Sequence, residues 1–455
     1  MNSLDAPGEP DAVRAPAGTI VGRRHARTRR FLGIPFAEPP TGARRFAAPV
    51  PRGRFTQPYD ASRHGPTAQR VPLFATTTVP EPSVPGDDVL NLGIVAPAAD
   101  EDRAPCPVLV WIHGGGFLAG SPASPWYDGR AFARDGVVCV TVGYRLGVDG
   151  FAVLDGVPTN LGLRDLLLAL DWVRENISAF GGDPDRVTVA GQSAGGAAVL
   201  ALLSSPAGYG RFQRAVSLSG GFFEAGAVSD FLGRLGDRLG VPATRAGFGG
   251  RSVADVQRAV LDLRDERGDD TLVLGPFVGD DILPVPVAQG LAVRGHDVPV
   301  LLGATGDEFD RGAMDGAARA AGSRLTDTLF RAACPRTAEA RRAARAGTWL
   351  YSFEWPSPVL GGAAHCVDIP YFFDVLDAPG VTEALGPNPP AELATLMHAD
   401  LVRFVRGREP AWARATGGLG DPVREYGRPS APLVADTTGV FDPVVRQVSR
   451  AARTC

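Results

Sequence analysis

The sequence predicts an α/β protein in which a mainly parallel sheet is covered by helices on both faces. Short apolar runs rich in β-branched residues alternate with segments of helical periodicity, a pattern typical of parallel sheets buried on both sides. Two glycine-rich segments directly follow such runs, so each is expected in a loop at the end of a strand. Apolar residues make up 44% of the 455 positions, which is enough for a large core.

The predicted elements follow one another without a linker or an internal repeat. After an N-terminal region of short strands and turns, strands are predicted for residues 108–112, 137–142, 186–190, 214–218, 298–302 and 348–353. Helices are predicted for residues 161–177, 197–203, 253–263 and 391–405. We therefore expect residues 18–455 to form a single domain. Residues 1–17 are polar and rich in proline, and we expect them to be disordered or loosely attached.

Composition excludes several classes of function. A formal charge of −4 leaves no electrostatic footprint for nucleic acid or an anionic membrane. All 46 basic residues are Arg, and the absence of Lys excludes Schiff-base catalysis and a Walker-type phosphate lysine. No apolar run approaches the ~18 residues of a membrane span, and no signal peptide is visible. Five cysteines without CxxC spacing predict neither disulfides nor a metal cluster, so we expect a cytoplasmic protein with reduced thiols.

The segment G-Q-S-A-G at residues 191–195 matches the pattern of a nucleophile elbow. A β-branched strand runs directly into it and a helix-forming segment follows, which is the setting that this turn requires. Gly191 and Gly195 allow a tight turn in which larger side chains would collide with neighbouring backbone. The Ser193 hydroxyl would then lie at a helix N-terminus, where developing negative charge is favoured. An ordinary glycine-rich turn is the alternative, and the flanking elements favour the nucleophile.

A second glycine-rich segment, H-G-G-G-F at residues 113–117, follows the strand predicted for residues 108–112. Consecutive glycines let backbone N–H groups turn towards a substrate without a Cβ in the way. We expect the amides of Gly115 and Gly116, together with that of Ala194, to form an oxyanion hole.

The base and the acid are sought by chain order, because hydrolases with this elbow place the acid and then the histidine after the serine. His365 follows a glycine-containing loop and fits the last position, with His398 as the alternative. Asp307 and Glu308 both follow the strand predicted from residue 298, and spacing alone leaves the choice between them open.

Further motifs extend this pattern over most of the chain. The sequence resembles the type-B carboxylesterase/cholinesterase family of α/β-hydrolases from about Gly18 to Trp412. The motifs that carry the resemblance are FLGIPFAEPP at residues 31–40, DDVLNL at 87–92, WIHGGGF at 111–117, YRLG at 144–147, the block at 160–196 and GATGDE at 303–308. The block at 160–196 is the most specific of these.

The resemblance implies the α/β-hydrolase fold and a serine esterase for small-molecule carboxylic esters. It implies that Glu308, rather than Asp307, orients His365, which activates Ser193 to form an acyl-enzyme without a metal or cofactor. The same triad could serve a thioesterase, an amidase, or an acyltransferase or cyclase of a specialised-metabolite pathway. A non-catalytic binding protein is a remote alternative, because such members usually lose the nucleophile. The oligomeric state stays open.

Departures from the family pattern lead to two further expectations. Gln192 replaces a Glu that is common beside the nucleophile, so we expect activity to survive with a different pH profile. The interval of 57 positions from Glu308 to His365 is shorter than usual, so we expect a more open active site. The aromatic residues that we expect to line the substrate pocket are Phe117, Trp126, Phe222 and Phe223.

Overall fold

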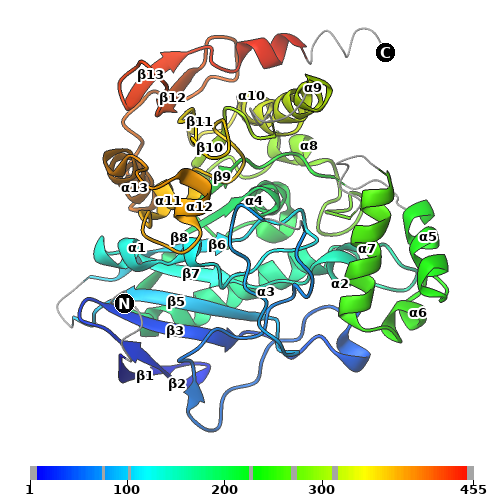
Figure 1. Ribbon diagram of the computed structural model, residues 1–455. Coiled ribbons are helices and arrows are strands. Elements are labelled where there is room, and N and C mark those ends of the chain that lie inside the picture. Colours follow the sequence, from blue (N-terminus) through cyan, green and yellow to red (C-terminus); the bar gives the residue numbers. More distant parts are fainter. Residues whose placement is uncertain are drawn as a thin grey trace.

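One sheet of 13 strands forms the centre of the computed structural model, which describes residues 8–73, 77–100, 104–224, 229–267, 274–309 and 316–447 (Figure 1). The strands are β1 (Glu9–Ala15), β2 (Gly18–Arg24), β3 (Thr28–Pro35), β4 (Tyr59–Asp60), β5 (Asn91–Pro97), β6 (Cys106–Ile112), β7 (Val138–Val142), β8 (Gly182–Gln192), β9 (Arg214–Leu218), β10 (Val300–Thr305), β11 (Thr348–Phe353), β12 (Pro422–Tyr426) and β13 (Val434–Thr438). They pair in the order β1-β2-β3-β5-β7-β6-β8-β9-β10-β11-β12-β13, and β4 pairs with β2. Neighbours from β7 to β12 are parallel, whereas the pairs at both margins are antiparallel except for β2 with β4.

Helices cover both faces of this sheet. They are α1 (Arg130–Arg134), α2 (Gly147–Phe151), α3 (Leu161–Asn176), α4 (Ala194–Ser204), α5 (Ser229–Leu239), α6 (Arg245–Gly249), α7 (Val253–Arg267), α8 (Val287–Leu291), α9 (Gly316–Leu325), α10 (Ala333–Ala340), α11 (Ile369–Phe373), α12 (Val381–Leu385) and α13 (Ala391–Val405). Side chains of α3 and α4 belong to one core, and those of α1, α11 and α13 belong to a second core. The predicted fold class is confirmed. Among the helices described, none is long and apolar enough to cross a membrane.

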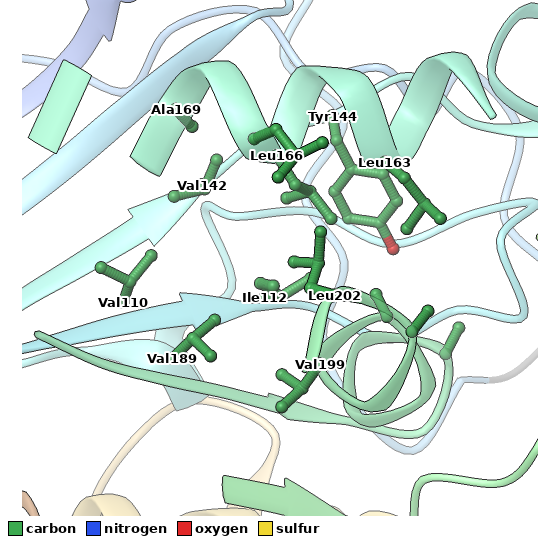
Figure 2. Close-up of a cluster of buried hydrophobic side chains, with 14 of the residues drawn as sticks. Val110, Ile112, Val142, Tyr144, Leu163, Leu166, Ala169, Val189, Val199 and Leu202 are labelled. Carbon is green, nitrogen blue, oxygen red and sulfur yellow. The ribbon is translucent and has the colours of Figure 1, made fainter. Parts of the chain in front are cut away.

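Side chains along β6 alternate between the two cores. Val108, Val110 and Ile112 lie in the core under α3 and α4, while Leu109 and Trp111 lie in the core on the opposite face. Figure 2 shows part of the first core, where side chains of β6, β7 and β8 meet those of α3 and α4. Every residue of β6 is buried. The strands that carry glycine-rich loops at their ends are therefore packed on both sides, which holds those loops on rigid supports.

The N-terminal strand β1 corrects one expectation. Residues 9–15 pair antiparallel with β2 along their whole length, so they are neither disordered nor loosely attached, although residues 1–17 were expected to be so. Val13 and Ala15 are buried two positions apart, an alternation that the sequence already contains. Residues 1–7 lie outside the described part of the chain. We keep the proposal that residues 18–455 form a single domain, since one sheet joins their strands.

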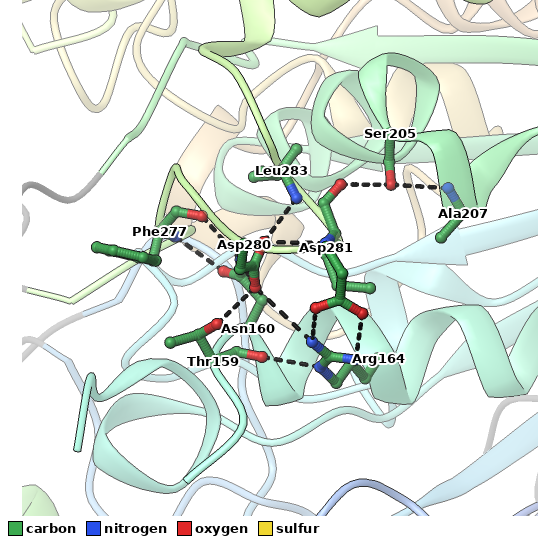
Figure 3. Close-up of polar contacts among 10 residues, drawn as sticks. Thr159, Asn160, Arg164, Ser205, Ala207, Phe277, Asp280, Asp281 and Leu283 are labelled. Carbon is green, nitrogen blue, oxygen red and sulfur yellow. Dashed lines mark hydrogen bonds and ion pairs between the residues drawn. The ribbon is translucent and has the colours of Figure 1, made fainter. Parts of the chain in front are cut away.

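A polar cluster fixes the loop before α8 to the start of α3 (Figure 3). The Asn160 side chain donates to the carbonyl of Phe277 and accepts from its amide, both at 2.8 Å, and also donates to Asp280 at 2.9 Å. The same loop runs beside the ring of Phe117, since a Cβ added to Gly275 would lie 3.5 Å from that ring. The cluster therefore supports one side of the glycine loop that follows β6.

Candidate active site

The turn between β8 and α4 holds Ser193 in a strained backbone conformation. Its φ of 56° and ψ of −123° lie outside the regions that L-residues favour. A Cβ added to Gly195 would lie 2.0 Å from the carbonyl oxygen of Ile112, and one added to Gly191 would lie 2.5 Å from the carbonyl of Gly195. Only glycine fits at both positions. The turn therefore presents the Ser193 side chain at the start of α4, in the manner expected of a nucleophile elbow.

Ser193, His365 and Glu308 form one continuous chain of polar contacts. His365 Nε2 lies 2.9 Å from Ser193 Oγ, and His365 Nδ1 contacts Glu308 Oε2 directly. The other carboxylate oxygen of Glu308 accepts a hydrogen bond of 2.9 Å from the amide of Thr305. Glu308 is fully buried, whereas Ser193 keeps 8% of its surface exposed. This arrangement can move a proton from the hydroxyl to the imidazole while the carboxylate stays shielded from water.

Two loops, one after β10 and one after β11, carry the acid and the base. These strands are parallel neighbours, and their loops are joined by backbone hydrogen bonds from His365 N to Glu308 O at 2.9 Å and from Asp307 N to Ala363 O at 3.0 Å. The Asp307 carboxylate accepts a further bond of 2.8 Å from the Ala363 amide. Of the two acids between which spacing could not choose, Glu308 contacts the imidazole, while Asp307 fastens the loop that carries it.

The surroundings of His365 favour its protonated form. Burial disfavours the imidazolium, but neighbouring Cys366 and the Glu308 carboxylate act in the opposite direction, and the pKa of His365 rises well above its usual value. A second buried carboxyl, Asp368, accepts a hydrogen bond of 3.0 Å from the Tyr351 hydroxyl. Burial, together with the charge of Glu308, raises the pKa of Asp368 to about 7. No motif in the sequence points to Asp368, and its position shortly after His365 is the one available signal.

Gln192 contacts the same imidazole nitrogen as the nucleophile. Its Nε2 lies 3.3 Å from His365 Nε2, and its side chain is almost fully buried. An amide N–H donates to the lone pair of a neutral imidazole and has nothing to donate to on an imidazolium. The contact therefore favours the neutral form of His365. A carboxylate at this position would favour the charged form.

The glycine loop after β6 lies beside the nucleophile because β6 and β8 are parallel neighbours. Ile112, the last residue of β6, is opposite Gly191 in the sheet. A Cβ added to Gly114 would lie 3.1 Å from the Cβ of Ser193, so the loop backbone approaches the serine closely. The register of the two strands thus brings together two glycine-rich segments that lie about 80 positions apart in the sequence.

The amides predicted to bind an oxyanion flank this contact. Gly115 and Gly116 have φ of 108° and 60°, values that turn the loop back on itself. Ala194 is the first residue of α4, and its N–H is among those that have no intrahelical partner. That Gly115, Gly116 and Ala194 act together as an oxyanion hole stays a prediction.

His113 holds the glycine loop through contacts with Tyr144 and with the loop backbone. Its ring stacks on Tyr144 with 4.6 Å between centroids, and the Tyr144 hydroxyl donates to the His113 carbonyl at 2.9 Å. Its Nδ1 lies 2.8 Å from the carbonyl oxygen of Gly114. Burial lowers the pKa of His113 to about 4, so this ring is neutral near pH 7.

Two of the four aromatic residues expected in the substrate pocket are core residues. Phe117 and Trp126 have no exposed surface. The Phe117 ring packs on Phe151 with 4.7 Å between centroids, and the Trp126 indole donates to the carbonyl of Pro379 at 3.0 Å. The prediction is wrong for these two, because a side chain without accessible surface presents none to a substrate.

The aromatic surface beside the triad comes from other residues as well. The rings of Phe309 and Phe330 lie 5.1 and 5.0 Å from the His365 ring, and Phe223 packs on Phe330 at 5.5 Å. Phe222 is half-buried, so it and Phe223 stay candidates for the pocket. Phe309 follows the acid in the sequence and could have been found from that position. Phe330 carries no such signal, because only the fold brings it to the histidine.

His398, the alternative base, belongs to the core on the opposite face. Its Nδ1 lies 2.8 Å from the carbonyl oxygen of Phe372, and its Nε2 lies 3.1 Å from Asp135 Oδ2. It therefore serves the packing of α13 against α1 and α11. Over the part of the chain that the structure describes, no group of three or more His, Cys, Asp or Glu side chains is arranged to hold a metal.

Comparisons with known proteins identify the family and the fold of the chain. A sequence model of the carboxylesterase family matches residues 9–324. The chain is 33% identical over 418 residues to para-nitrobenzyl esterase of Bacillus subtilis (strain 168), covering 80% of this chain and 83% of that protein. It is 30% identical over 437 residues to phenmedipham hydrolase of Pseudarthrobacter oxydans, covering 84% and 86%. Among solved structures, a PNB esterase superposes with a TM-score of 0.84 at 27% identity, covering 96% of this chain and 99% of that chain. A Geobacillus stearothermophilus carboxylesterase superposes with a TM-score of 0.81 at 30% identity and the same coverage.

Proposed function

Because the chain belongs to the carboxylesterase family, has the α/β-hydrolase fold and is a carboxylic ester hydrolase, we propose that it cleaves small-molecule esters through an acyl-enzyme on Ser193. The observation that carries this proposal is the unbroken contact from Ser193 Oγ through His365 to the buried Glu308. The proposed steps use these side chains, the backbone amides beside them and water.

In the first step His365 Nε2 takes the proton of Ser193 as Oγ attacks the ester carbonyl. The imidazolium that forms is stabilised by Glu308, whose second oxygen is anchored by the Thr305 amide. Since Gln192 donates to neutral His365, its contact weakens at this moment, and Glu308 supplies the opposing stabilisation. The two groups on the imidazole therefore act on different protonation states.

Negative charge on the carbonyl oxygen is the second demand of the reaction. We assign the amides of Gly115, Gly116 and Ala194 to this oxygen, because the loop and the helix start that carry them flank Ser193. Loss of one such donor typically lowers the rate by about 10²–10³-fold. His365 then gives its proton to the departing alcohol, and the acyl group remains on Ser193.

Hydrolysis of the acyl-enzyme repeats these roles with water. His365 takes a proton from water, the hydroxide attacks the acyl carbonyl, and the proton passes to Ser193 Oγ as the acid leaves. If an alcohol or amine replaced water, the same acyl-enzyme would yield transfer or cyclisation. Product analysis with added alcohol separates these outcomes, and we expect the free acid to dominate.

For the substrate we propose esters with apolar or aromatic groups. The rings of Phe309 and Phe330 pack beside the His365 imidazole. One relative is named for a para-nitrobenzyl ester, which carries an aromatic group. The short interval of 57 positions from Glu308 to His365 supports the proposal of a more open site. A series of p-nitrophenyl esters of increasing acyl length tests it, with activity retained for long chains.

The direct test of the mechanism is a fluorophosphonate probe followed by mapping of the modified peptide. We expect the probe to label Ser193 and the Ser193→Ala variant to lose kcat by roughly 10⁶-fold, as in other serine hydrolases. Ser178, which is exposed on the surface, provides a matched control as Ser178→Ala. Labelling elsewhere, or an active Ser193→Ala variant, would contradict the proposal.

The free thiols of Cys106, Cys139 and Cys334 support the further proposal of a cytoplasmic enzyme.

A further inference from the structure

Two adjoining hollows lie at the amino-terminal end of β6, whereas the triad lies beyond the carboxyl-terminal ends of the strands. They have volumes of about 500 and 360 Å³ and share Arg134, Asp135, Arg406 and Arg408. Cys106, the first residue of β6, lines the larger hollow, whereas the last residue of β6 leads to the glycine loop beside the nucleophile. At about 3.3 Å per residue, a seven-residue strand separates the two places by roughly 20 Å. A ligand in these hollows is therefore not the ester under attack.

The walls of the hollows are strongly basic. They come from α1, from the beginning of β8 and from the C-terminal end of α13, which lies next to α1 (Figure 1). The arginines that line them are Arg134, Arg186, Arg403, Arg406 and Arg408. The carboxylate in the lining is Asp135, which pairs with Arg134 at 2.7 Å, and Arg134 also pairs with Asp374 at 2.8 Å. Burial lowers the pKa of His398, so its ring adds no charge near pH 7.

The remaining arginines are held by neutral groups alone. Arg186 donates to the carbonyl of Pro105 at 3.3 Å, Arg403 donates to that of Glu409 at 2.6 Å, and Arg406 donates to that of Asp135. Within the described residues, these three and Arg408 form no ion pair with a carboxylate. Each guanidinium has five N–H donors, so most of them stay available at the hollow.

Such a cluster of cations carries an electrostatic penalty. Like charges repel, and the protein has 50 acidic residues against 46 basic ones with which to pair them. Arg145, for comparison, binds Asp165 through two of its nitrogens. A helix C-terminus favours a nearby cation, which accounts for Arg403 and Arg406 at the end of α13. Arg186 comes from a different element, β8, and converges on the same space, where it also donates to the carbonyl of Arg406 at 3.5 Å.

We propose that these hollows bind an anion that carries a diphosphate group. The planar fork of guanidinium matches phosphate oxygens in pairs, and several forks around one space suit more than one phosphate. The volume of about 500 Å³ falls in the range of small-ligand sites, and exceeds what a single orthophosphate would fill. Binding here is non-covalent and leaves the ester chemistry unchanged.

The test measures binding of inorganic pyrophosphate by calorimetry and by thermal unfolding, at constant ionic strength. We expect saturable binding, a Tm that rises with pyrophosphate concentration and weaker binding of orthophosphate. ADP serves as a second arm: tighter binding than pyrophosphate assigns a nucleotide, and equal or weaker binding assigns the diphosphate alone. The absence of saturable pyrophosphate binding, or equal affinity for orthophosphate, would overturn the proposal.

The variant Arg408→Ala identifies the site without disturbing a contact, because its side chain makes no hydrogen bond in the described structure. We expect at least tenfold weaker pyrophosphate binding and unchanged esterase kcat/KM. Arg14→Ala removes an exposed arginine from β1 that lines neither hollow, and should bind pyrophosphate like the wild type.

Thermal unfolding of Arg408→Ala without any added anion tests whether the arginines form a binding site or only stabilise the fold. If the arginines repel one another, Arg408→Ala leaves Tm unchanged or raises it at low salt. If they serve only to stabilise the end of α13, Arg408→Ala lowers Tm and leaves pyrophosphate binding as it was. The second pattern would refute the proposed site, while esterase activity of the same sample verifies that the variant is folded.

Discussion

Two buried pairs in this molecule each join a carboxylate to a basic side chain, but one serves stability and the other serves the proposed chemistry. Asp165 receives three hydrogen bonds from Arg145, from the backbone amide at 3.0 Å and from the guanidinium at 2.8 and 2.6 Å. Glu308 contacts the imidazole of His365 in a similar way, but the other ring nitrogen faces Ser193. In the first pair, the carboxylate and the guanidinium bind each other and contact no reactive group. In the second pair, His365 Nε2 is left to contact the nucleophile Ser193.

The comparison shows that the role of a buried carboxylate depends on whether its basic partner can lose a proton. Arginine keeps its proton at every pH at which proteins fold, so the Arg145–Asp165 pair can only hold the loop after β7 against α3. Histidine gains and loses its proton near neutral pH, so the carboxylate of Glu308 acts on a proton that moves. Stability and chemistry are therefore separable by substitution.

The largest expected effect is on activity and comes from Glu308→Gln. The amide keeps the bond from Thr305 N to Oε1 but loses the charge that stabilises the imidazolium. We expect kcat to fall by about 10⁴-fold with little change in Tm. Steady-state kinetics and thermal unfolding of the same preparation measure both quantities. A variant within tenfold of the wild type would show that the two ion pairs do not differ as described.

The next effect is on stability and comes from Asp165→Asn. The charge of Arg145, 2% exposed, would be left without its carboxylate, which typically lowers the free energy of unfolding by about 3–5 kcal/mol. We expect kcat per labelled Ser193 to stay near that of the wild type, because the pair does not touch the triad. Chemical denaturation measures the loss.

The matched control is the exposed pair between Arg345 and Asp297, with a distance of 2.7 Å. Asp297→Asn should unfold at nearly the same denaturant concentration as the wild type, because solvent screens that pair. Equal losses for Asp165→Asn and Asp297→Asn would remove burial as the explanation.

The smallest effect is a shift in pH dependence. Ester hydrolysis needs neutral His365, whose pKa is raised, so kcat/KM should fall as pH decreases through a value above 6.5. Gln192→Glu replaces a donor to the neutral ring with a carboxylate that favours the imidazolium. The acidic limb should therefore move to higher pH, with the plateau activity largely kept. Gln192→Ala, which removes the amide and adds no charge, should move it less. A shift to lower pH for Gln192→Glu would reverse the assigned role of Gln192.

Local sequence patterns were sufficient for the sheet and for the loops that carry the nucleophile. Strands at residues 214–218 and 348–353 and the helix at 391–405 appear with the predicted bounds, because buried parallel strands and amphipathic helices leave strong periodic signals. Strand β1 was missed because only Val13 and Ala15 turn inward, and the remaining positions include a proline and three charged residues. This edge strand gives a weaker pattern than the buried strands do.

The side chains around the histidine were not predictable from local patterns. Spacing could not separate Asp307 from Glu308, because both follow β10 and only loop geometry decides which one faces the ring. Phe330 reaches His365 from a distant segment, and Trp126 turned into the core, where its indole finds a backbone carbonyl. Contacts between distant segments depend on tertiary packing, and local sequence patterns do not reveal them.

The hydrogen bonds between the loops after β10 and β11 have a consequence for the chain that joins them. His365 N to Glu308 O and Ala363 N to Asp307 Oδ2 fasten the two ends of that chain together. The intervening segment, which includes α10 and β11, is thus closed at both ends, and the entropy of closing a loop grows only slowly with its length. Insertions and deletions in its connections outside β11 should be tolerated while acid and base stay in place. Active-site access could then diverge between relatives without any rebuilding of the proton path.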